Sequence, residues 1–265
     1  MSTGLIVIRG GGDLGSGVAH RLQQARYGVV ILEIAQPTVI RRRVAFASAV
    51  YDGEITVEGV KAVRVDDAPM ARRAVSQGMI PVLVDPDGHT LADLQPAAIV
   101  DARLAKRNLG TRPTDAPVVI GLGPGFVAGS DVHAVIETQR GHDVGRVIYA
   151  GAAAPDTGVP GGVGGEDARR VLRAPLAGVV HGTREIGAAI KAGEIVGYVD
   201  DAPVAAPING VLRGIIHDGV AVSAGLKIGD IDPRGIVDYC FTISDKARAI
   251  GGGVLEALLH FGVLP

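Results

Sequence analysis

A glycine-rich segment close to the start of the chain constrains the fold more than any other feature. It begins at Gly10, after the apolar run 5–8 and Arg9, and it precedes a stretch with apolar residues at helical spacing. A buried strand, a tight turn and a helix produce this order, and the spacing of Gly10, Gly12 and Gly15 fits the dinucleotide-binding fingerprint. In such turns a phosphate approaches the backbone N–H groups at the helix N-terminus. We therefore expect Gly10, Gly12, Asp13 and Gly15 to bind a phosphate-bearing ligand; the alternative is a tightly packed turn that binds nothing.

A second apolar run, residues 29–34, contains Glu33. Dinucleotide folds place an acidic residue near this point to bind a ribose hydroxyl, so Glu33 is a candidate cofactor-binding residue. Pro37 follows at a position suited to open a helix. That helix would carry three arginines, residues 41–43, either toward a phosphate or on a solvated face.

Further apolar runs at residues 80–84, 98–101 and 118–121 alternate with helical patterns, which predicts an α/β fold with a Rossmann-like parallel sheet. Polar residues and glycines follow two of these runs, at the strand ends where open α/β sheets bind ligands. Asp101, Lys106 and Arg107 are candidates for proton transfer or for binding an anion; a loop of solvated charges is the alternative. Gly123 and Gly125 are candidates to present N–H groups to a phosphate or oxyanion.

Composition excludes several classes of function. The formal net charge is −2, the isoelectric point is about 6.4, and the chain has four Phe, five Tyr and no Trp, so we expect no nucleic-acid partner. The apolar runs are too short to cross a bilayer, the start lacks the pattern of a secretory signal, and Cys240 is the single cysteine. These features predict a cytoplasmic protein with no membrane association and a buried, unreactive Cys240.

Metal binding is not expected. His133 and Glu137 share a face at a spacing of four residues, and His142 follows nearby. Two histidines and one acid spread over a predicted hairpin more often form an ordinary polar surface than a metal site.

The second half of the chain contains an internal repeat. Residues 173–179 recur as residues 205–211, and residues 187–193 recur as 219–225, both at an offset of 32. The pattern resembles the biotinyl/lipoyl-type barrel-sandwich hybrid, in which two similar halves meet at a hairpin that carries the modified lysine. The corresponding segment here, residues 199–204, has no lysine, so we expect no covalent swinging arm.

These patterns predict a domain order. Residues 1–154 form the Rossmann-like domain, 155–169 a Gly/Pro-rich linker, 170–236 the small all-β barrel-sandwich module, and 237–265 a C-terminal helix that packs on the first domain.

Seven segments together resemble the YqeB-type accessory proteins linked to selenium-dependent molybdenum hydroxylases. They include IVIRGGGDLGSGVAHRL, VDARLAKRN, GLGPGF, VIETQRGHDVGRVI and ISDKARAIGGGVLEALL, and the likeness runs nearly end to end. It implies a maturation factor, distantly similar to xanthine dehydrogenase accessory factors, with an apo-molybdenum hydroxylase as partner and a molybdopterin-type cofactor or dinucleotide as ligand. Two alternatives stay open: an NAD(P)-dependent oxidoreductase, and a non-catalytic scaffold.

Overall fold

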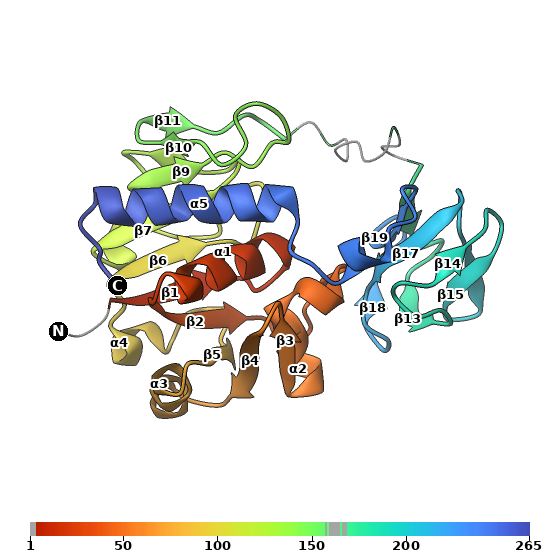
Figure 1. Ribbon diagram of the computed structural model, residues 1–265, viewed down its shortest axis with the longest axis horizontal. Coiled ribbons are helices and arrows are strands. Elements are labelled where there is room, and N and C mark those ends of the chain that lie inside the picture. The colour runs from red at the N-terminus through yellow and green to blue at the C-terminus, as the bar shows by residue number, and fades with distance from the viewer. Residues whose placement is uncertain (1–3, 157, 159–164, 166–168) are drawn as a thin grey trace. The chain divides into compact units, whose positions relative to one another are not determined.

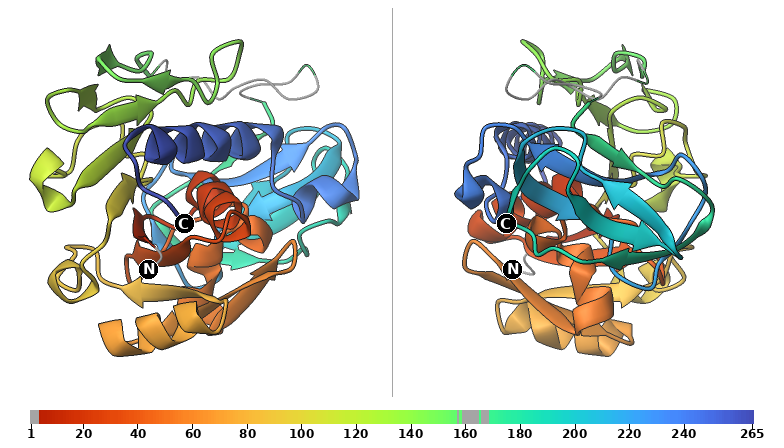
Figure 2. Two further views of the ribbon diagram at one scale, coloured as in Figure 1. Left: turned by 60° about the vertical axis from the view of Figure 1, so that its left-hand side comes forward. Right: turned by 90° about the vertical axis from the view of Figure 1, so that its right-hand side faces the viewer.

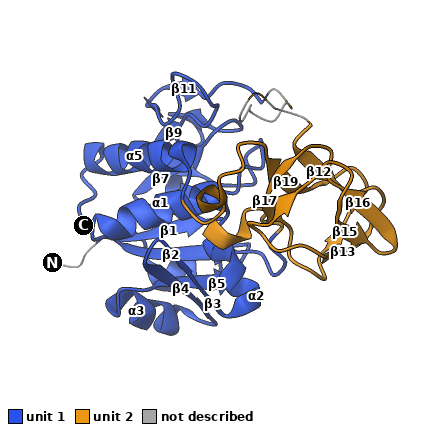
Figure 3. Ribbon diagram, turned by 45° about the vertical axis from the view of Figure 1, so that its right-hand side comes forward, with its two compact units in different colours: residues 1–37, 45–157, 243–265 blue, residues 38–44, 158–242 orange. Residues whose placement is uncertain are grey.

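The computed structural model describes residues 4–156, 158, 165 and 169–265. They form two compact units, which Figure 3 shows in different colours. The first unit consists of Met1–Pro37, Ala45–Thr157 and Ile243–Pro265, and the second of Thr38–Val44 and Gly158–Thr242. Most of the expected linker, residues 155–169, lies outside the described residues.

This division differs from the expected domain boundaries at two short segments, residues 38–44 and residues 237–242, which both belong to the second unit. Residues 38–44 belong to the second unit because Arg41 donates 2.9 Å hydrogen bonds to the carbonyl oxygens of Tyr239 and Thr242. A Cβ atom at Gly214 would lie 2.4 Å from the carbonyl oxygen of Ile40, so this segment packs closely on the second unit's own backbone. The expected helix through residues 41–43 is replaced by the short 3-10 turn η1 (Arg42–Val44).

The first unit is built on a nine-stranded sheet (Figure 1). From one edge to the other its strands are β10 (Val147–Ile148), β9 (Ala134–Ile136), β7 (Val118–Leu122), β6 (Ala98–Asp101), β1 (Leu5–Arg9), β2 (Gly28–Glu33), β5 (Ile80–Val84), β4 (Val60–Val65) and β3 (Glu54–Val57). The strands from β9 to β4 run parallel. A separate two-stranded sheet pairs β8 (Val127–Ala128) with β11 (Gly151–Ala152).

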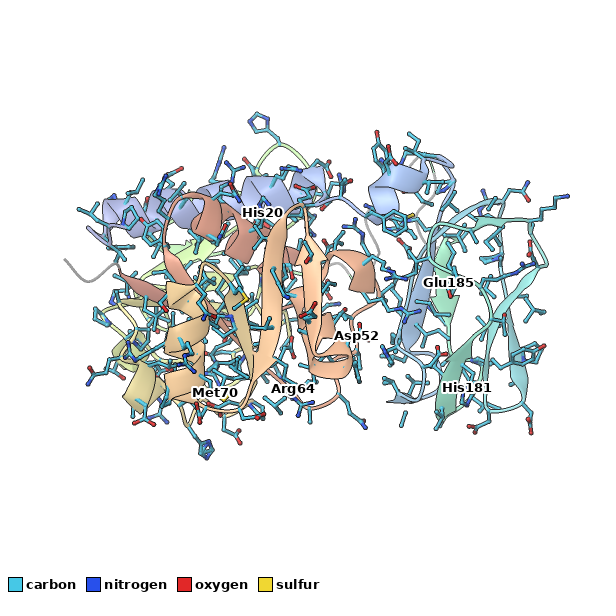
Figure 4. All side chains as sticks on the ribbon, turned by 60° about the horizontal axis from the view of Figure 1, so that its bottom comes forward. His20, Asp52, Arg64, Met70, His181 and Glu185 are labelled. Atoms are coloured by element: carbon cyan, nitrogen blue, oxygen red, sulfur yellow. The ribbon has the colours of Figure 1, made fainter. Side chains whose placement is uncertain are left out.

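The expected Rossmann-like parallel sheet is wrong, because the sheet is mixed. Its outermost strands, β3 and β10, are antiparallel to their neighbours. At one edge Glu58 and Gly59 both have positive φ, 45° and 82°, which favours a two-residue hairpin turn instead of a crossover to another parallel strand. Arg64 of β4 ties this hairpin to α2 (Ala49–Asp52) by a 3.0 Å hydrogen bond to the carbonyl oxygen of Val50 (Figure 4).

Helices cover both faces of this sheet. The connections β1–α1–β2 and β4–α3–β5 run in opposite directions along the sheet, so right-handed crossovers place α1 (Asp13–Gln24) and α3 (Ala68–Ser76) on opposite faces. The C-terminal helix α5 (Asp245–His260) lies beside α1, as Figures 1 and 2 both show. The short elements of this unit are α4 (Leu91–Leu94), η2 (Phe46–Ser48) and η3 (Pro113–Asp115).

Helices α1 and α5 approach each other through small residues. A Cβ atom at Gly17 of α1 would lie 2.7 Å from the Cβ atom of Ala247. A Cβ atom at Gly251 would lie 3.0 Å from the carbonyl oxygen of Gly17. The glycines therefore permit a backbone separation that larger residues would prevent.

The second unit consists of two four-stranded antiparallel sheets. One has the order β12 (Val171–Arg173), β19 (Lys227–Asp232), β17 (Gly210–Ile215), β14 (Ala189–Ile190), and the other β16 (Ala202–Ala205), β15 (Ile195–Val199), β13 (Gly178–Gly182), β18 (Ala221–Val222). The 3-10 turn η4 (Val237–Cys240) follows. The repeat corresponds strand for strand at the offset of 32, since β13 matches β17 and β14 matches β18.

The expected biotinyl/lipoyl-like barrel module is also wrong, because the strands separate into these two antiparallel sheets. The tip of the hairpin between β15 and β16, Asp200 and Asp201, is exposed but hydrogen-bonded to a neighbouring strand. The Asp200 carboxylate accepts a 2.9 Å hydrogen bond from the Val179 N–H, and Asp200 N–H donates to the Val179 carbonyl oxygen at 2.9 Å. The hairpin is therefore tied back to β13.

None of the helices in the described part of the chain combines the length and apolar character needed to cross a bilayer.

Candidate functional site

The candidate site lies where the order of the parallel strands reverses. Strand β1 has β2 on one side and β6 on the other, and the chain reaches β6 only after completing β5 and β4 on the β2 side. At such a reversal the loops that follow the two strands separate, and open α/β sheets bind ligands there. The carboxyl ends of β1 and β6 bring the glycine-rich turn beside Asp101, since Arg9 pairs with Asp101 in the sheet.

Two glycines of the turn are required by close backbone packing. Gly10 has a φ of +98°, and a Cβ atom there would lie 3.0 Å from the carbonyl oxygen of Ala102. A Cβ atom at Gly15 would lie only 2.1 Å from the carbonyl oxygen of Gly10. Gly12 is the N-cap of α1, with φ −67° and ψ −174°. Packing alone therefore accounts for Gly10 and Gly15.

The turn is held by the protein's own chain at residues 46 and 47. Ala47 N–H donates to the Gly11 carbonyl oxygen at 2.9 Å, and Phe46 N–H donates to Ser16 Oγ at 2.7 Å. Ser16 Oγ in turn donates to the Gly11 carbonyl oxygen at 2.9 Å. Two of these hydrogen bonds end on the Gly11 carbonyl oxygen and the third holds Ser16 in place, so the turn is pre-formed and part of its surface is already covered.

Glu33 is bound to the turn itself. Its carboxylate accepts hydrogen bonds from the N–H groups of Gly11 (2.7 Å) and Ile34 (2.8 Å). The side chain is buried, and burial raises the pKa of Glu33 although these two hydrogen bonds oppose the shift. A ribose hydroxyl would therefore have to share this carboxylate with two backbone donors.

A lysine that sequence reasoning missed lies near the start of α1. The N-cap residue of this helix is Gly12, which has no side chain with which to cap it. Lys246, in the first turn of α5, is half-buried, and burial followed by repulsion from Arg140 lowers the pKa of Lys246, with Asp13 acting against the shift. The pairing of α1 with α5 brings this ammonium to the turn. The only sequence signal was its place beside the N-cap Ser244, which did not reveal what the helix packs on.

Asp101 does not have the surroundings of a catalytic base. Its carboxylate accepts hydrogen bonds from Arg103 Nη2 (2.5 Å) and Thr111 Oγ1 (2.6 Å), and it is 1% exposed. Burial opposes its ionisation, but the hydrogen bonds from Arg103 and Thr111 outweigh burial and hold the pKa of Asp101 below its ordinary value. A carboxylate held in its charged form by a guanidinium is a weak proton acceptor.

The other predicted edge residues have partners of their own. Lys106 pairs with Asp156 at 2.6 Å. A Cβ atom at Gly125 would lie 2.6 Å from the Cα and N atoms of Arg107, so these two loops pack backbone to backbone. Gly123 N–H donates to the Ile136 carbonyl oxygen at 2.9 Å, which leaves this donor already used.

His133 and Glu137, near β9, have local partners. His133 Nδ1 accepts a 3.0 Å hydrogen bond from Val119 N–H, and Glu137 accepts from the N–H groups of Gln139 (2.6 Å) and Ala154 (2.7 Å). Within the described ranges, no group of three or more His, Cys, Asp and Glu side chains could hold a metal ion. Cys240 is buried, and burial raises the pKa of its thiol, as in an unreactive core cysteine.

Comparison with solved structures gives weak likenesses. An aspartoacylase family protein from Mesorhizobium loti is 12% identical with a TM-score of 0.28, covering 87% of this chain and 85% of that one. A succinylglutamate desuccinylase/aspartoacylase from Rhodobacter sphaeroides is 15% identical with a TM-score of 0.27, covering 87% and 85%. TM-scores this low establish neither a shared fold nor a shared activity.

Comparison with curated sequences gives a much stronger result. No family model matches the chain. The Escherichia coli (strain K12) protein "Uncharacterized protein YqeB" is 53% identical over 262 residues, which is 98% of this chain and 48% of that protein. The chain thus spans about half the length of this relative. The extent and identity of the match place this chain in the YqeB family.

Proposed function

We propose that this chain is an accessory protein for a molybdenum hydroxylase, and that it binds a molybdopterin-type cofactor or a related nucleotide at the carboxyl edge of its nine-stranded sheet. One observation carries the binding proposal. At the point where the strand order reverses, the uncapped N-terminus of α1 follows a pre-formed glycine turn, with Lys246 near Asp13. The amides of a first helical turn and a nearby ammonium favour a phosphate group.

The accessory role is supported by the family, because the sequence segments that resemble YqeB-type proteins cover the chain nearly end to end. Two of these segments form the binding edge: the glycine turn with α1, and the start of α5 that carries Lys246. The selenium-dependent hydroxylase as partner is proposed on the same resemblance. Since the chain spans 48% of the YqeB relative, the activity of the whole relative is a proposal as well.

A nicotinamide cofactor is the second candidate ligand. Glu33 ends β2 beside Gly11, where a dinucleotide fold would bind a ribose. The two backbone N–H groups already bound to its carboxylate weaken this candidate. A titration with each ligand distinguishes the two candidates.

The experiment is a calorimetric titration of the purified protein with molybdenum cofactor, NADH and NADPH. We expect binding of the molybdenum cofactor at micromolar protein. Binding of NADH or NADPH alone would contradict the proposal and support the oxidoreductase. Binding of none of the three would support the scaffold.

Two substitutions at Gly12 test the place of binding. Its extended backbone suits an N-cap Asp or Asn, so both variants should keep α1 intact. Gly12→Asp puts a negative charge on the first-turn amides and should weaken cofactor binding at least about tenfold, whereas Gly12→Asn supplies the same cap without the charge. Equal loss in both variants would show that bulk, and not charge, blocks the site.

A further inference from the structure

A separate pocket lies at the same sheet edge but on the other face. Its volume is about 360 Å³, within the range of roughly 300–1,000 Å³ that small-molecule pockets occupy. Its lining is mostly polar and includes three arginines, Arg9, Arg103 and Arg112. Pro86, Leu91 and Leu109 supply a small apolar part. Asp87 and Asp115 also line it.

Side-chain alternation places this pocket away from the glycine turn. Val7 and Ile99 pack in the core cluster that contains the buried residues of α3. Arg9 and Asp101 stand two residues further along the same strands, so their side chains lie on this same α3 face. The glycine turn instead leads into α1 on the opposite face.

Arg9 is a buried cation without a carboxylate hydrogen bond in the described structure. It is 7% exposed. Its Nη2 donates to the Pro86 carbonyl oxygen at 3.0 Å and its Nη1 lies 3.4 Å from Thr111 Oγ1, whereas its Nε has no hydrogen-bond partner among the described residues. Buried guanidinium groups are normally paired, because desolvating the charge is costly.

The carboxylates that act on Arg9 are those of Asp101, Asp115 and Asp85, and each already has another donor. Asp115 accepts from the Arg112 N–H at 3.0 Å. Asp101 accepts from Arg103 and Thr111. Asp85 accepts from the N–H groups of residues 88–90 and from the Thr90 hydroxyl. Burial, and next the neighbouring Arg103, lowers the pKa of Arg9, although Asp101 acts against this shift. The guanidinium is thus in surroundings that an additional anion would improve.

We propose that this pocket binds a phosphate monoester, with the phosphate at Arg9 and Arg103 and the organic part against Leu91 and Leu109. Guanidinium forks match the oxygens of a phosphate and bind it with charge-assisted hydrogen bonds. Arg103 is held in place by Asp101 and Thr111, so it is positioned before the ligand arrives. Arg112 lies at the exposed rim. The proposal does not depend on the cofactor proposed for the α1 face.

The test uses phenyl phosphate, inorganic phosphate and benzoate as calorimetric probes of the full chain. We expect phenyl phosphate to bind more tightly than inorganic phosphate, since only the ester reaches the leucines, and more tightly than benzoate. No binding of phenyl phosphate at millimolar concentration would overturn the proposal. Equal affinity for the ester and inorganic phosphate would overturn the assignment of the organic part.

Two arginine variants locate the phosphate. Arg9→Lys keeps the buried charge but loses the planar fork, and should weaken phenyl phosphate binding at least about tenfold. Arg112→Gln changes only an exposed rim residue, so it should fold normally and weaken binding a few-fold. Arg73→Gln, on an exposed position of α3 away from the pocket lining, is the matched control and should bind like the unaltered protein.

Gly12→Asp separates this proposal from the cofactor proposal. We expect this variant to bind phenyl phosphate normally, because Gly12 lies on the α1 side of the edge. Loss of binding in Gly12→Asp, with normal binding in Arg9→Lys and Arg112→Gln, would assign the phosphate to the glycine turn and overturn the pocket.

Discussion

The two faces of the sheet edge differ in how closely the backbone packs and in how charged side chains are paired. On the α1 face, the glycine turn is packed by its own chain: Ala47 and Ser16 hydrogen-bond to Gly11, and Gly15 lies against Gly10. On the α3 face, the loops after β5 and β6 leave a pocket of about 360 Å³. Backbone packing therefore explains most of the glycine-rich fingerprint. The pocket proposed to bind a phosphate monoester, in contrast, is not marked by any sequence motif.

The two faces also hold their acids differently. Glu33 on the α1 face is bound only by backbone N–H groups, whereas Asp101 on the α3 face is bound by Arg103 and Thr111. At Glu33 the backbone hydrogen bonds do not offset burial, and the pKa is raised. At Asp101 the hydrogen bonds from Arg103 and Thr111 outweigh burial, and the pKa is lowered. The following variants test this contrast.

Asp101→Asn should have the largest effect. It removes the charge that pairs with the half-buried Arg103 and that also acts favourably on the buried guanidinium of Arg9. We expect a loss of about 3 kcal/mol in the free energy of unfolding, measured by urea denaturation at neutral pH. A loss within 0.5 kcal/mol of zero, roughly the size of a surface substitution, would show that the network contributes little to stability.

Gly15→Ala tests how tightly the α1 face is packed. Its Cβ atom would lie 2.1 Å from the backbone oxygen of Gly10, so the turn must shift, at a cost of about 2 kcal/mol. The matched variant on the pocket side is Gly110→Ala, where φ is +91° and nothing lies within 4 Å of a Cβ atom. It should cost only about 1 kcal/mol of backbone strain. Equal urea midpoints for the two variants would contradict the contrast.

The two acids should give pH dependences of opposite sign. The pKa of Asp101 is lowered in the folded state, so its contribution to stability is present above about pH 4 and is lost as the pH falls further. The pKa of Glu33 is raised, so stability falls as the pH rises from about 4 through the folded-state pKa. Glu33→Gln leaves no ionisable group at this position and should remove that fall.

Urea midpoints measured from pH 3 to pH 7 check this prediction. Asp101→Asn should flatten the acid side of the profile, and Glu33→Gln the side above pH 4. If both substitutions flattened the same side, the two carboxylates would not differ as the structure indicates.

The smallest effect is expected in α5. Gly252 has nothing within 4 Å of a Cβ atom, so Gly252→Ala should stabilise the protein by about 0.8 kcal/mol through helix propensity. The adjacent Gly253→Ala places a Cβ atom 2.1 Å from the carbonyl oxygen of Gly145 and should destabilise it. Thermal unfolding of the two variants measures both signs, and stabilisation by both substitutions would contradict close packing at Gly253.

Local patterns in the sequence predicted many of the elements but not their assembly. The apolar runs at residues 5–8, 80–84 and 98–101 correspond to β1, β5 and β6, and the hairpin of β9 with β10 was also readable. The strand β3 was missed because its apolar content is low, and its turn uses Glu58 where Asn or Asp is the usual signal. Together with β10, this strand makes the sheet mixed, because both are antiparallel to their neighbours.

Sequence patterns were sufficient to predict the glycine turn, the 32-residue offset of the repeat and the family. Each of these depends on residues close together in the chain or on direct similarity to other sequences. Tertiary structure alone decided what surrounds each site. Arg9 and Arg103 are 94 positions apart, and Lys246 is more than 200 positions from the turn that it approaches. Such neighbours arise from strand order and helix packing, which leave no periodicity in the sequence for local analysis to detect.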